Sequence, residues 1–346
     1  MPESVLVAFF IGFSTAYFAI FAYQINFLWE GRHMRLNRLL GACFAYWTLT
    51  NVKDLVLTVP GFYSRFMLDN IIMIDGWSFI AYTCMMFEIT MPGWVTKKRI
   101  ALLAIPFVLF MLVYILCPTT LVVDVYLAFL TIGGLSMLAI GYTKAIKYIK
   151  YIRNNYSNIE ELDISWVKYV CIIAAILQIL WLCASLLGKE ISDCFYYALN
   201  IVFSQIIVAH CRRLKPIMLQ AEEPGLVPEE RIYAFEGVVE KMVEDEQLYL
   251  NPNLSLADLT RRLGTNRTYL SDYFTNVKGI SFYDFVNSMR INKKSVPMIK
   301  EHPEYTFDYV AMQSGFNSLS TFRRAFVKFT GKTPGHYRET ESGCRL

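Results

Sequence analysis

Long apolar segments fill the first two thirds of the chain and constrain its fold more than any other feature. A helix needs roughly 20 apolar residues to cross about 30 Å of hydrocarbon. Seven segments meet this need, at approximately residues 5–29, 36–59, 66–91, 99–117, 119–143, 166–188 and 192–211. They account for a composition that is 55% hydrophobic and only 18% charged. We therefore predict a seven-helix transmembrane domain in residues 1–215.

Lysine and arginine follow alternate spans and set the expected orientation. Positive charge near span ends is retained on the cytoplasmic side of a membrane. Basic residues follow spans one, three, five and seven, whereas the other loops hold only Arg65 and Lys189. This pattern places the N-terminus outside and everything after His210 in the cytoplasm. The first span is too long for the apolar core of a signal peptide, so we expect it to be retained.

Five ionisable residues lie within these spans and are expected in the outer half of the bilayer. They are Lys53, Asp54, Asp69, Asp75 and Asp124. Charges inside a membrane are costly and are usually paired or functional. One interpretation is a polar pocket that senses a small ligand, and the other is a structural ion-pair network between spans two and three. Because the external loops are short, any stimulus is expected to act on the bundle itself.

Other polar residues in the spans, and the cysteines and histidines, suggest structural roles. Glu88, Gln178 and Gln205 are expected to form hydrogen bonds between helices. The eight cysteines include no C-x-x-C pair and the four histidines are scattered, so we expect no metal site and no cofactor. The sequence holds no H-E-x-x-H motif, G-x-S-x-G motif or phosphate-binding glycine loop, and we do not expect an enzyme.

The last third of the chain has the composition of a soluble helical domain. Residues 216–230 are rich in proline, glycine and charge and predict a linker before a domain at 231–346. Residues 222–246 hold nine acidic and two basic residues, a net charge of −7, whereas 250–338 hold thirteen basic and six acidic residues, a net charge of +7. The acidic part should avoid phosphate, and the basic part should attract an anionic polymer.

An internal repeat in the basic part predicts two helix-turn-helix units, at about 255–279 and 306–331. The pattern Leu259-x4-Gly264-x9-Phe274-x4-Gly279 recurs as Val310-x4-Gly315-x10-Phe326-x4-Gly331. In the first copy Ser255 and Asp258 resemble a capping box, Gly264 supplies a turn and Asn266 is placed to cap the next helix.

The second helix of each copy has a buried apolar stripe and a polar outer face. Leu270, Phe274 and Val277 form the stripe in the first copy, and Phe322, Phe326 and Phe329 form it in the second. A helix of this kind fits the major groove of DNA with its outer residues on base edges. Between the copies, residues 281–300 predict a connecting helix of about 30 Å, close to the roughly 34 Å between successive major-groove faces.

The C-terminal residues closely resemble the signature of the AraC/XylS family of bacterial regulators. The resemblance rests on Gly315-Phe316-Asn317-Ser318-Leu319-Ser320-Thr321-Phe322-Arg323-Arg324-Ala325-Phe326 and on Gly331-Lys332-Thr333-Pro334-Gly335-His336-Tyr337-Arg338. It covers about residues 230–340, and the first copy and Arg290-Ile291 agree with it. It implies sequence-specific binding to double-stranded DNA and control of transcription with RNA polymerase as a partner. With the apolar spans, it predicts a location in the bacterial cytoplasmic (inner) membrane.

The resemblance also assigns DNA contacts to individual residues. Base-reading positions correspond to Thr268, Ser271 and Asp272 in the first unit and to Leu319, Ser320 and Arg324 in the second. Arg267, Arg323 and Lys328 are expected to contact phosphate. For each position the alternative is a solvated helix face.

Two features depart from the family pattern. Asp272 puts a negative charge where the family often has a basic or amide residue, which favours a contact with cytosine N4 or a weaker first unit. Lys294 and Pro297 replace small or apolar positions, and proline is expected to end the connecting helix near Val296.

The sequence therefore predicts an all-α membrane-bound transcription regulator switched by an unknown small-molecule or membrane signal. The soluble part is compatible with a homodimer, because paired half-sites multiply specificity, although no heptad seam demonstrates one. A transporter or receptor-like protein with a secondary DNA-binding module is the alternative. An intramembrane enzyme built on Lys53, Asp54 and Asp75 is a third class.

Overall fold

The chain is all-α. The computed structural model describes residues 2–29, 34–55, 59, 64–187, 190–215 and 236–341, and in that part it contains helices and no strand. The chain divides into two compact units. The first consists of residues 1–148 and 164–219, and the second consists of residues 149–163 and 220–346. The second unit thus includes a segment that is flanked on both sides by residues of the first. The predicted linker 216–230 lies outside the described residues.

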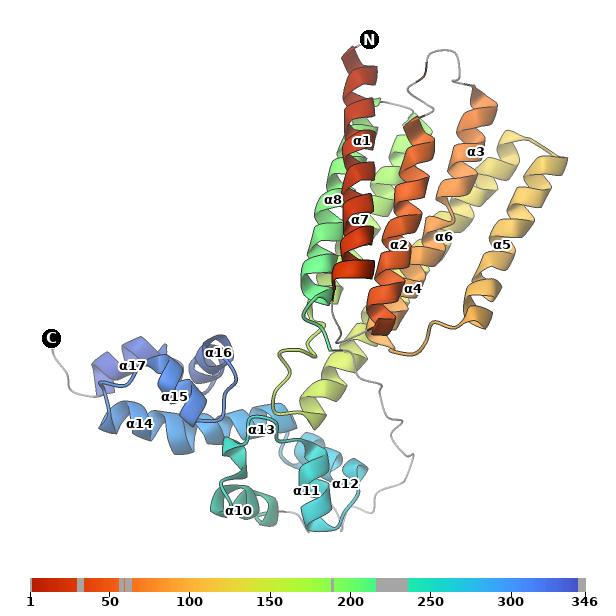
Figure 1. Cartoon of the computed structure of the whole chain (residues 1–346). Helices are drawn as coiled ribbons and strands as arrows, with labels where there is room; N and C mark the ends of the chain where they lie inside the picture. The colour runs from red at the N-terminus through yellow and green to blue at the C-terminus, as the bar shows by residue number, and fades with distance from the viewer. Residues whose placement is uncertain are drawn as a thin grey trace. The chain divides into compact units, whose positions relative to one another are not determined.

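The first unit is a bundle of long helices (Figure 1). They are α1 (Pro2–Tyr23), α2 (Met34–Asp54), α3 (Arg65–Asp75), α4 (Ser78–Thr90), α5 (Lys97–Leu116), α6 (Thr120–Asn155), α7 (Trp166–Leu187) and α8 (Glu190–Cys211). A π-helical turn, Gln24–Leu28, extends α1. The helix α1 packs against α2 and α8, and α2 also packs against α4.

Five segments of this bundle are long and apolar enough to span a membrane. Among the described residues they are Val5–Leu28, Arg65–Thr90, Lys97–Leu116, Thr120–Asn155 and Cys194–Cys211, with a shorter apolar helix at Trp166–Leu182. The helix α2 carries Arg35 and Arg38 in its first turns and ends with Lys53 and Asp54, and it stands outside this group. Large apolar side chains of α5 face outward, among them Leu102, Leu109 and Ile115. Continuous exposed apolar surface of this kind is typical of a face that contacts lipid.

The segment predicted as one span at 66–91 is divided into α3 and α4. The break lies at Gly76–Trp77, where the Tyr126 hydroxyl donates a hydrogen bond to the Met73 carbonyl at 2.9 Å. A Cβ atom at Gly76 would lie 2.0 Å from that hydroxyl oxygen. Glycine therefore allows α6 to approach the backbone of the broken span.

The three polar residues of the spans each contact another helix, as predicted. The Gln178 amide donates to the Leu130 carbonyl at 2.7 Å, and Gln205 accepts from the Tyr17 hydroxyl at 2.9 Å. Glu88 of α4 pairs with Arg35 of α2 at 2.7 Å. Its carboxylate also accepts from the backbone N–H groups of Gly93 and Val95, and so organises the loop after α4.

The second unit contains short helices arranged as two helix-turn-helix units on a connector. They are α10 (Val238–Asp245), α11 (Leu256–Leu263), α12 (Arg267–Asp272), α13 (Phe282–Met289), α14 (Val296–Glu301), α15 (Phe307–Gln313), α16 (Leu319–Thr330) and α17 (Pro334–Glu341). A 3₁₀ turn, Leu248–Leu250, follows α10, and a π-helical turn, Tyr273–Val277, follows α12.

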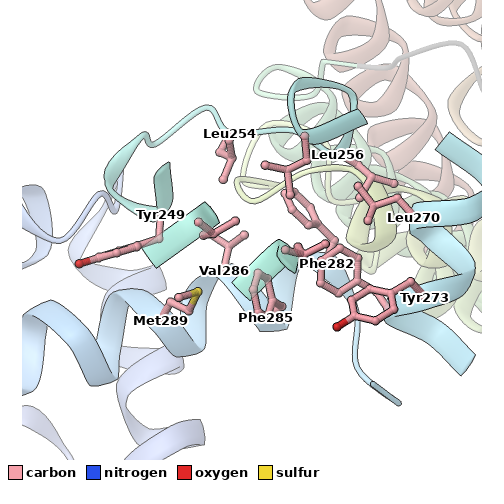
Figure 2. Close-up of a cluster of buried hydrophobic side chains, with 13 residues drawn as sticks. Tyr249, Leu254, Leu256, Leu270, Tyr273, Phe282, Phe285, Val286 and Met289 are labelled. Carbon is pink, nitrogen blue, oxygen red and sulfur yellow. The ribbon is translucent and has the colours of Figure 1, made fainter. Parts of the chain in front are cut away.

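Each helix-turn-helix unit has its own apolar core. The first core gathers side chains from α10 to α13, including Leu259, Phe274 and Phe285, and Figure 2 shows it in close-up. The second core is formed by Ile291, Ile299, Val310, Ala311, Phe316, Phe322, Ala325 and Phe326. Phe274, Phe322 and Phe326 are buried as predicted, whereas Phe329 is only partly buried.

The connector continues past the point where proline was expected to end it. The helix α13 leads into a π-helical turn, Arg290–Ser295, and then into α14, which ends at Glu301. Pro297 stands in the first turn of α14, where its missing N–H is not needed. The Ser295 hydroxyl donates to the Arg290 carbonyl at 3.0 Å within the wider turn. The prediction of a stop near Val296 was wrong, because the π-helical turn accommodates the proline.

Candidate nucleic-acid interface

Local sequence signals fix the first helix-turn-helix unit. Ser255 and Asp258 form the predicted capping box at the start of α11, with the Ser255 N–H donating to the Asp258 carboxylate at 2.9 Å. Gly264 ends α11 at φ 61°, a left-handed conformation that glycine adopts without steric cost. The Asn266 side chain then accepts the Tyr269 N–H at 2.9 Å and caps α12. These three predictions are confirmed.

The capping carboxylate is held in its charged form. Partial burial raises the pKa of Asp258, but the hydrogen bonds from Ser255 and the charge of Arg261 outweigh it. The pKa of this carboxyl therefore lies below its ordinary value, and at neutral pH the start of α11 carries the negative charge that its helix dipole favours.

The second unit repeats this design with a longer turn, residues 314–318 against 264–266 in the first. Thr306 caps α15 and Ser318 caps α16, where the Thr321 N–H donates to the Ser318 hydroxyl at 3.2 Å. Between them Gly315 is buried at φ 82°. A Cβ atom there would lie 2.6 Å from the Leu250 carbonyl oxygen. Only glycine allows the turn of the second unit to touch the backbone that follows α10.

The predicted base-reading residues lie on the outer faces of α12 and α16. Ser320 and Arg324 are exposed on α16, and Leu319 is partly buried. The Arg324 guanidinium donates to the Thr321 hydroxyl at 3.2 Å. In the first unit Thr268, Ser271 and Asp272 are all partly buried. The helix α16 therefore presents a more exposed polar face than α12.

The predicted phosphate-contacting residues differ in their surroundings. Arg323 is exposed on α16. Lys328, also exposed, pairs with Asp284 of α13 at 2.7 Å. Arg267 is partly buried and donates to the Tyr151 hydroxyl at 2.8 Å, with its guanidinium 5.3 Å from the centre of that ring. Arg267 thus has a protein partner where the sequence suggested an open cation.

Arg290 of the connector holds the second unit together and was not assigned a role from the sequence. Its side chain is 1% exposed. Its guanidinium donates to the carbonyls of Tyr249 and Asn251, both at 2.7 Å, to the Asn287 side chain at 3.0 Å, and to the carbonyl and hydroxyl of Ser157 at 3.3 and 3.2 Å. Burial lowers the pKa of Arg290 to about 10, so the group remains charged at neutral pH.

The ionisable residues of the spans form two separate groups. Lys53 pairs with Asp54 and with Asp75, the latter at 2.7 Å, and the Tyr197 hydroxyl donates to Asp54 at 2.8 Å. Asp69 pairs with Arg65 at 3.0 Å and accepts from the Tyr114 hydroxyl at 3.2 Å.

Asp124 is exposed on α6 and appears in neither group. Among the described ion pairs none joins Asp69 or Asp124 to Lys53, so the structure does not bring all five residues together. Tyr197 was not singled out from the sequence, because a tyrosine in an apolar helix gives no distinct signal.

Comparison with known proteins supports a DNA-binding role for the second unit. Residues 259–340 match the family described as "Helix-turn-helix domain", so the chain carries an AraC-type helix-turn-helix domain at its C-terminus. Over 92 residues the chain is 34% identical to an uncharacterized HTH-type transcriptional regulator of Staphylococcus aureus (strain COL), covering 27% of this chain. Over 86 residues it is 35% identical to the uncharacterized HTH-type transcriptional regulator YtdP of Bacillus subtilis (strain 168), covering 25% of this chain.

These likenesses concern the C-terminal part alone. The chain spans 12% of the length of the first relative and 11% of the second. No solved structure was found to match the chain.

Proposed function

We propose that this chain is a membrane-bound transcription regulator that binds double-stranded DNA in a sequence-specific manner. The observation that carries the proposal is the pair of capped helices α12 and α16, each following a glycine turn and each seated on its own apolar core. The relatives named as transcriptional regulators support it.

The connector gives the two units a suitable separation. From Phe282 to Glu301 it holds 20 residues, which at 1.5 Å per residue correspond to about 30 Å. Successive major-groove faces on one side of DNA are roughly 34 Å apart. One chain is therefore expected to read two adjacent grooves, with base contacts from Thr268, Ser271, Asp272, Leu319, Ser320 and Arg324.

The membrane part of the proposal rests on the apolar helices. We propose seven spans in residues 1–215, a linker at 216–230 and a cytoplasmic DNA-binding domain at 231–346, in the bacterial cytoplasmic membrane. Because Lys53, Asp54 and Asp75 satisfy one another, their contacts favour a structural role over a ligand pocket. A small-molecule or membrane signal would then act on the packing of the bundle, and RNA polymerase and a second copy of the chain are the expected partners.

Base reading by Arg324 gives the first testable prediction. The chain, reconstituted in lipid nanodiscs, is incubated with a genomic DNA library at physiological salt, and bound fragments are sequenced. We expect a discrete motif for the unaltered chain. Arg324→Ala should reduce affinity for that motif by about 1–3 kcal/mol and relax the sequence preference in one half-site, because a base contact is lost.

Two variants serve as controls for this experiment. Arg323→Ala should weaken binding to all sequences alike. It should also reduce the slope of log affinity against log salt concentration by about one, as expected when one phosphate contact is lost. Lys241→Ala removes a positive charge from the acidic helix α10 and should leave the motif and the affinity unchanged. Uniform, salt-sensitive binding without any enriched motif would contradict the proposed function.

A further inference from the structure

The last turns of α6 and the loop that follows it fold against the DNA-binding unit. We call residues 149–163, which cluster with the second unit, the strap. The Ser157 N–H donates to the Leu254 carbonyl at 3.1 Å, and Tyr156 and Ser255 form an isolated antiparallel bridge. Ile152, Ile159 and Leu162 of the strap are buried. The strap is therefore joined to this unit by backbone contacts, and three of its apolar side chains are shielded from solvent.

A buried arginine anchors the centre of the strap. Ser157 is 1% exposed and accepts two hydrogen bonds from the Arg290 guanidinium through its carbonyl and its hydroxyl. Arg290 is itself buried in the connector between the two helix-turn-helix units. The strap thus contacts the element that sets the separation of the two units.

On one side of this anchor, the strap contacts the first helix-turn-helix unit. The Tyr151 hydroxyl and ring both engage Arg267, the first residue of α12. The Asn154 amide donates to the Thr275 hydroxyl at 3.3 Å. Arg267 is the residue expected to contact DNA phosphate in this unit. In the structure its guanidinium contacts Tyr151.

On the other side, the strap reaches the start of the second DNA-reading helix. The Glu160 carboxylate accepts hydrogen bonds from the hydroxyls of Ser318 and Thr321, in the first turn of α16. Thr321 in turn accepts from Arg324, and the Ser318 and Ser320 hydroxyls lie 3.0 Å apart. The Glu160 carboxylate is therefore linked to Ser320 through Ser318 and to Arg324 through Thr321.

The Glu160 carboxylate places a negative charge at the first turn of α16. The first turn of a helix carries a partial positive charge and free donors, so it attracts anions. A carboxylate fixed there satisfies those donors and repels an approaching phosphate. DNA can reach the first turn of α16 only if Glu160 leaves it.

We propose that the strap is an intramolecular competitor of DNA, with Tyr151 covering Arg267 in the first unit and Glu160 covering the start of α16 in the second. This rests on the proposed function, because it requires α16 to bind DNA. Since α6 runs without interruption from Thr120 to Asn155, the strap is the direct continuation of a predicted membrane span. A change in the bundle can thus reach the DNA-binding unit without passing through the linker.

The test compares DNA affinities of the full chain in nanodiscs, using the motif selected by the unaltered chain. Glu160→Gln keeps the shape of the side chain and removes its charge, so we expect binding tighter by about fivefold or more, the lower limit of a typical coupling between sites. Tyr151→Phe, which keeps the ring and removes the hydroxyl, should give a smaller gain. Glu301→Gln removes one negative charge from an exposed position at the end of α14 and should change affinity little.

Hydrogen exchange provides a second measurement on the same samples. Bound DNA should raise exchange in residues 149–163 while it protects the start of α16. Equal affinities of the unaltered chain and Glu160→Gln for the selected motif, or a strap that stays protected when DNA is bound, would overturn the competition. If neither chain selects a motif, the proposed function itself is wrong. That outcome differs from equal affinities for a selected motif, which overturn the competition alone.

Discussion

Replacing Arg290 with alanine is expected to destabilise the DNA-binding unit by about 3–5 kcal/mol, because several buried acceptors lose their side-chain donor at once. The substitution would leave the carbonyls of Tyr249, Asn251 and Ser157 without their donor inside the protein. Each unsatisfied buried group costs about 1–3 kcal/mol. Removal of the guanidinium also leaves a void beside Phe316, whose ring centre lies 5.5 Å from it.

Pulse proteolysis of the full chain in nanodiscs, across a urea series, measures this effect. The fraction of intact C-terminal unit gives its unfolding midpoint, which we expect to fall by about 1 M or more for slopes of about 1–3 kcal/mol per M. Arg262→Ala is the matched control, because Arg262 pairs with Glu246 at a half-exposed position. Such pairs contribute about 0–1 kcal/mol. Similar midpoints for the two variants would contradict the anchoring role of Arg290.

Gly315→Ala is expected to cost about 2–5 kcal/mol, far more than the same change at Gly264. Both glycines have positive φ, which costs other residues about 1–2 kcal/mol. At Gly315 the new Cβ would also lie 2.6 Å from the Leu250 carbonyl oxygen and 2.9 Å from that of Tyr249. Crowding in a packed site adds about 1–3 kcal/mol. At Gly264 no atom lies within 4 Å of the added Cβ, so only the conformational cost applies.

The same urea series compares the two glycine variants. Gly315 touches the backbone of Tyr249 and Leu250, and Arg290 donates to the carbonyls of Tyr249 and Asn251 in the same stretch. We therefore expect Gly315→Ala to disturb the contact between the two helix-turn-helix units. Its affinity for the selected DNA motif should fall along with its stability, whereas Gly264→Ala should keep most of both. Equal losses of stability at the two glycines would contradict the close approach.

The parts of the interface that sequence alone predicts are those encoded by neighbouring residues. The capping box at Ser255, the turn at Gly264 and the cap at Asn266 each depend on residues within one or two turns of a helix, and all three are present. The buried phenylalanines follow from helical periodicity for the same reason. The all-α fold follows from these local patterns and from the apolar segments.

Contacts between distant residues were not predictable in this way. The division of a span at Gly76 depends on Tyr126, and the passage of the connector through Pro297 depends on a π-helical turn that no local pattern signals. Glu160 looks like an ordinary polar residue of a loop, and Tyr151 looks like an ordinary residue of a helix face. Their role becomes visible only when the fold places them beside Ser318 and Arg267.

Because the strap consists of the end of α6 and the loop before α7, the second unit is not formed by one continuous stretch of the chain. A fragment that starts at the linker keeps both helix-turn-helix units but lacks Ser157 and Glu160, which belong to the same compact unit. Transplanting the C-terminal residues onto another protein would thus move α12 and α16 without the strap. Recombination between chains of this architecture would be expected to preserve function best when the strap and the C-terminal domain are exchanged together.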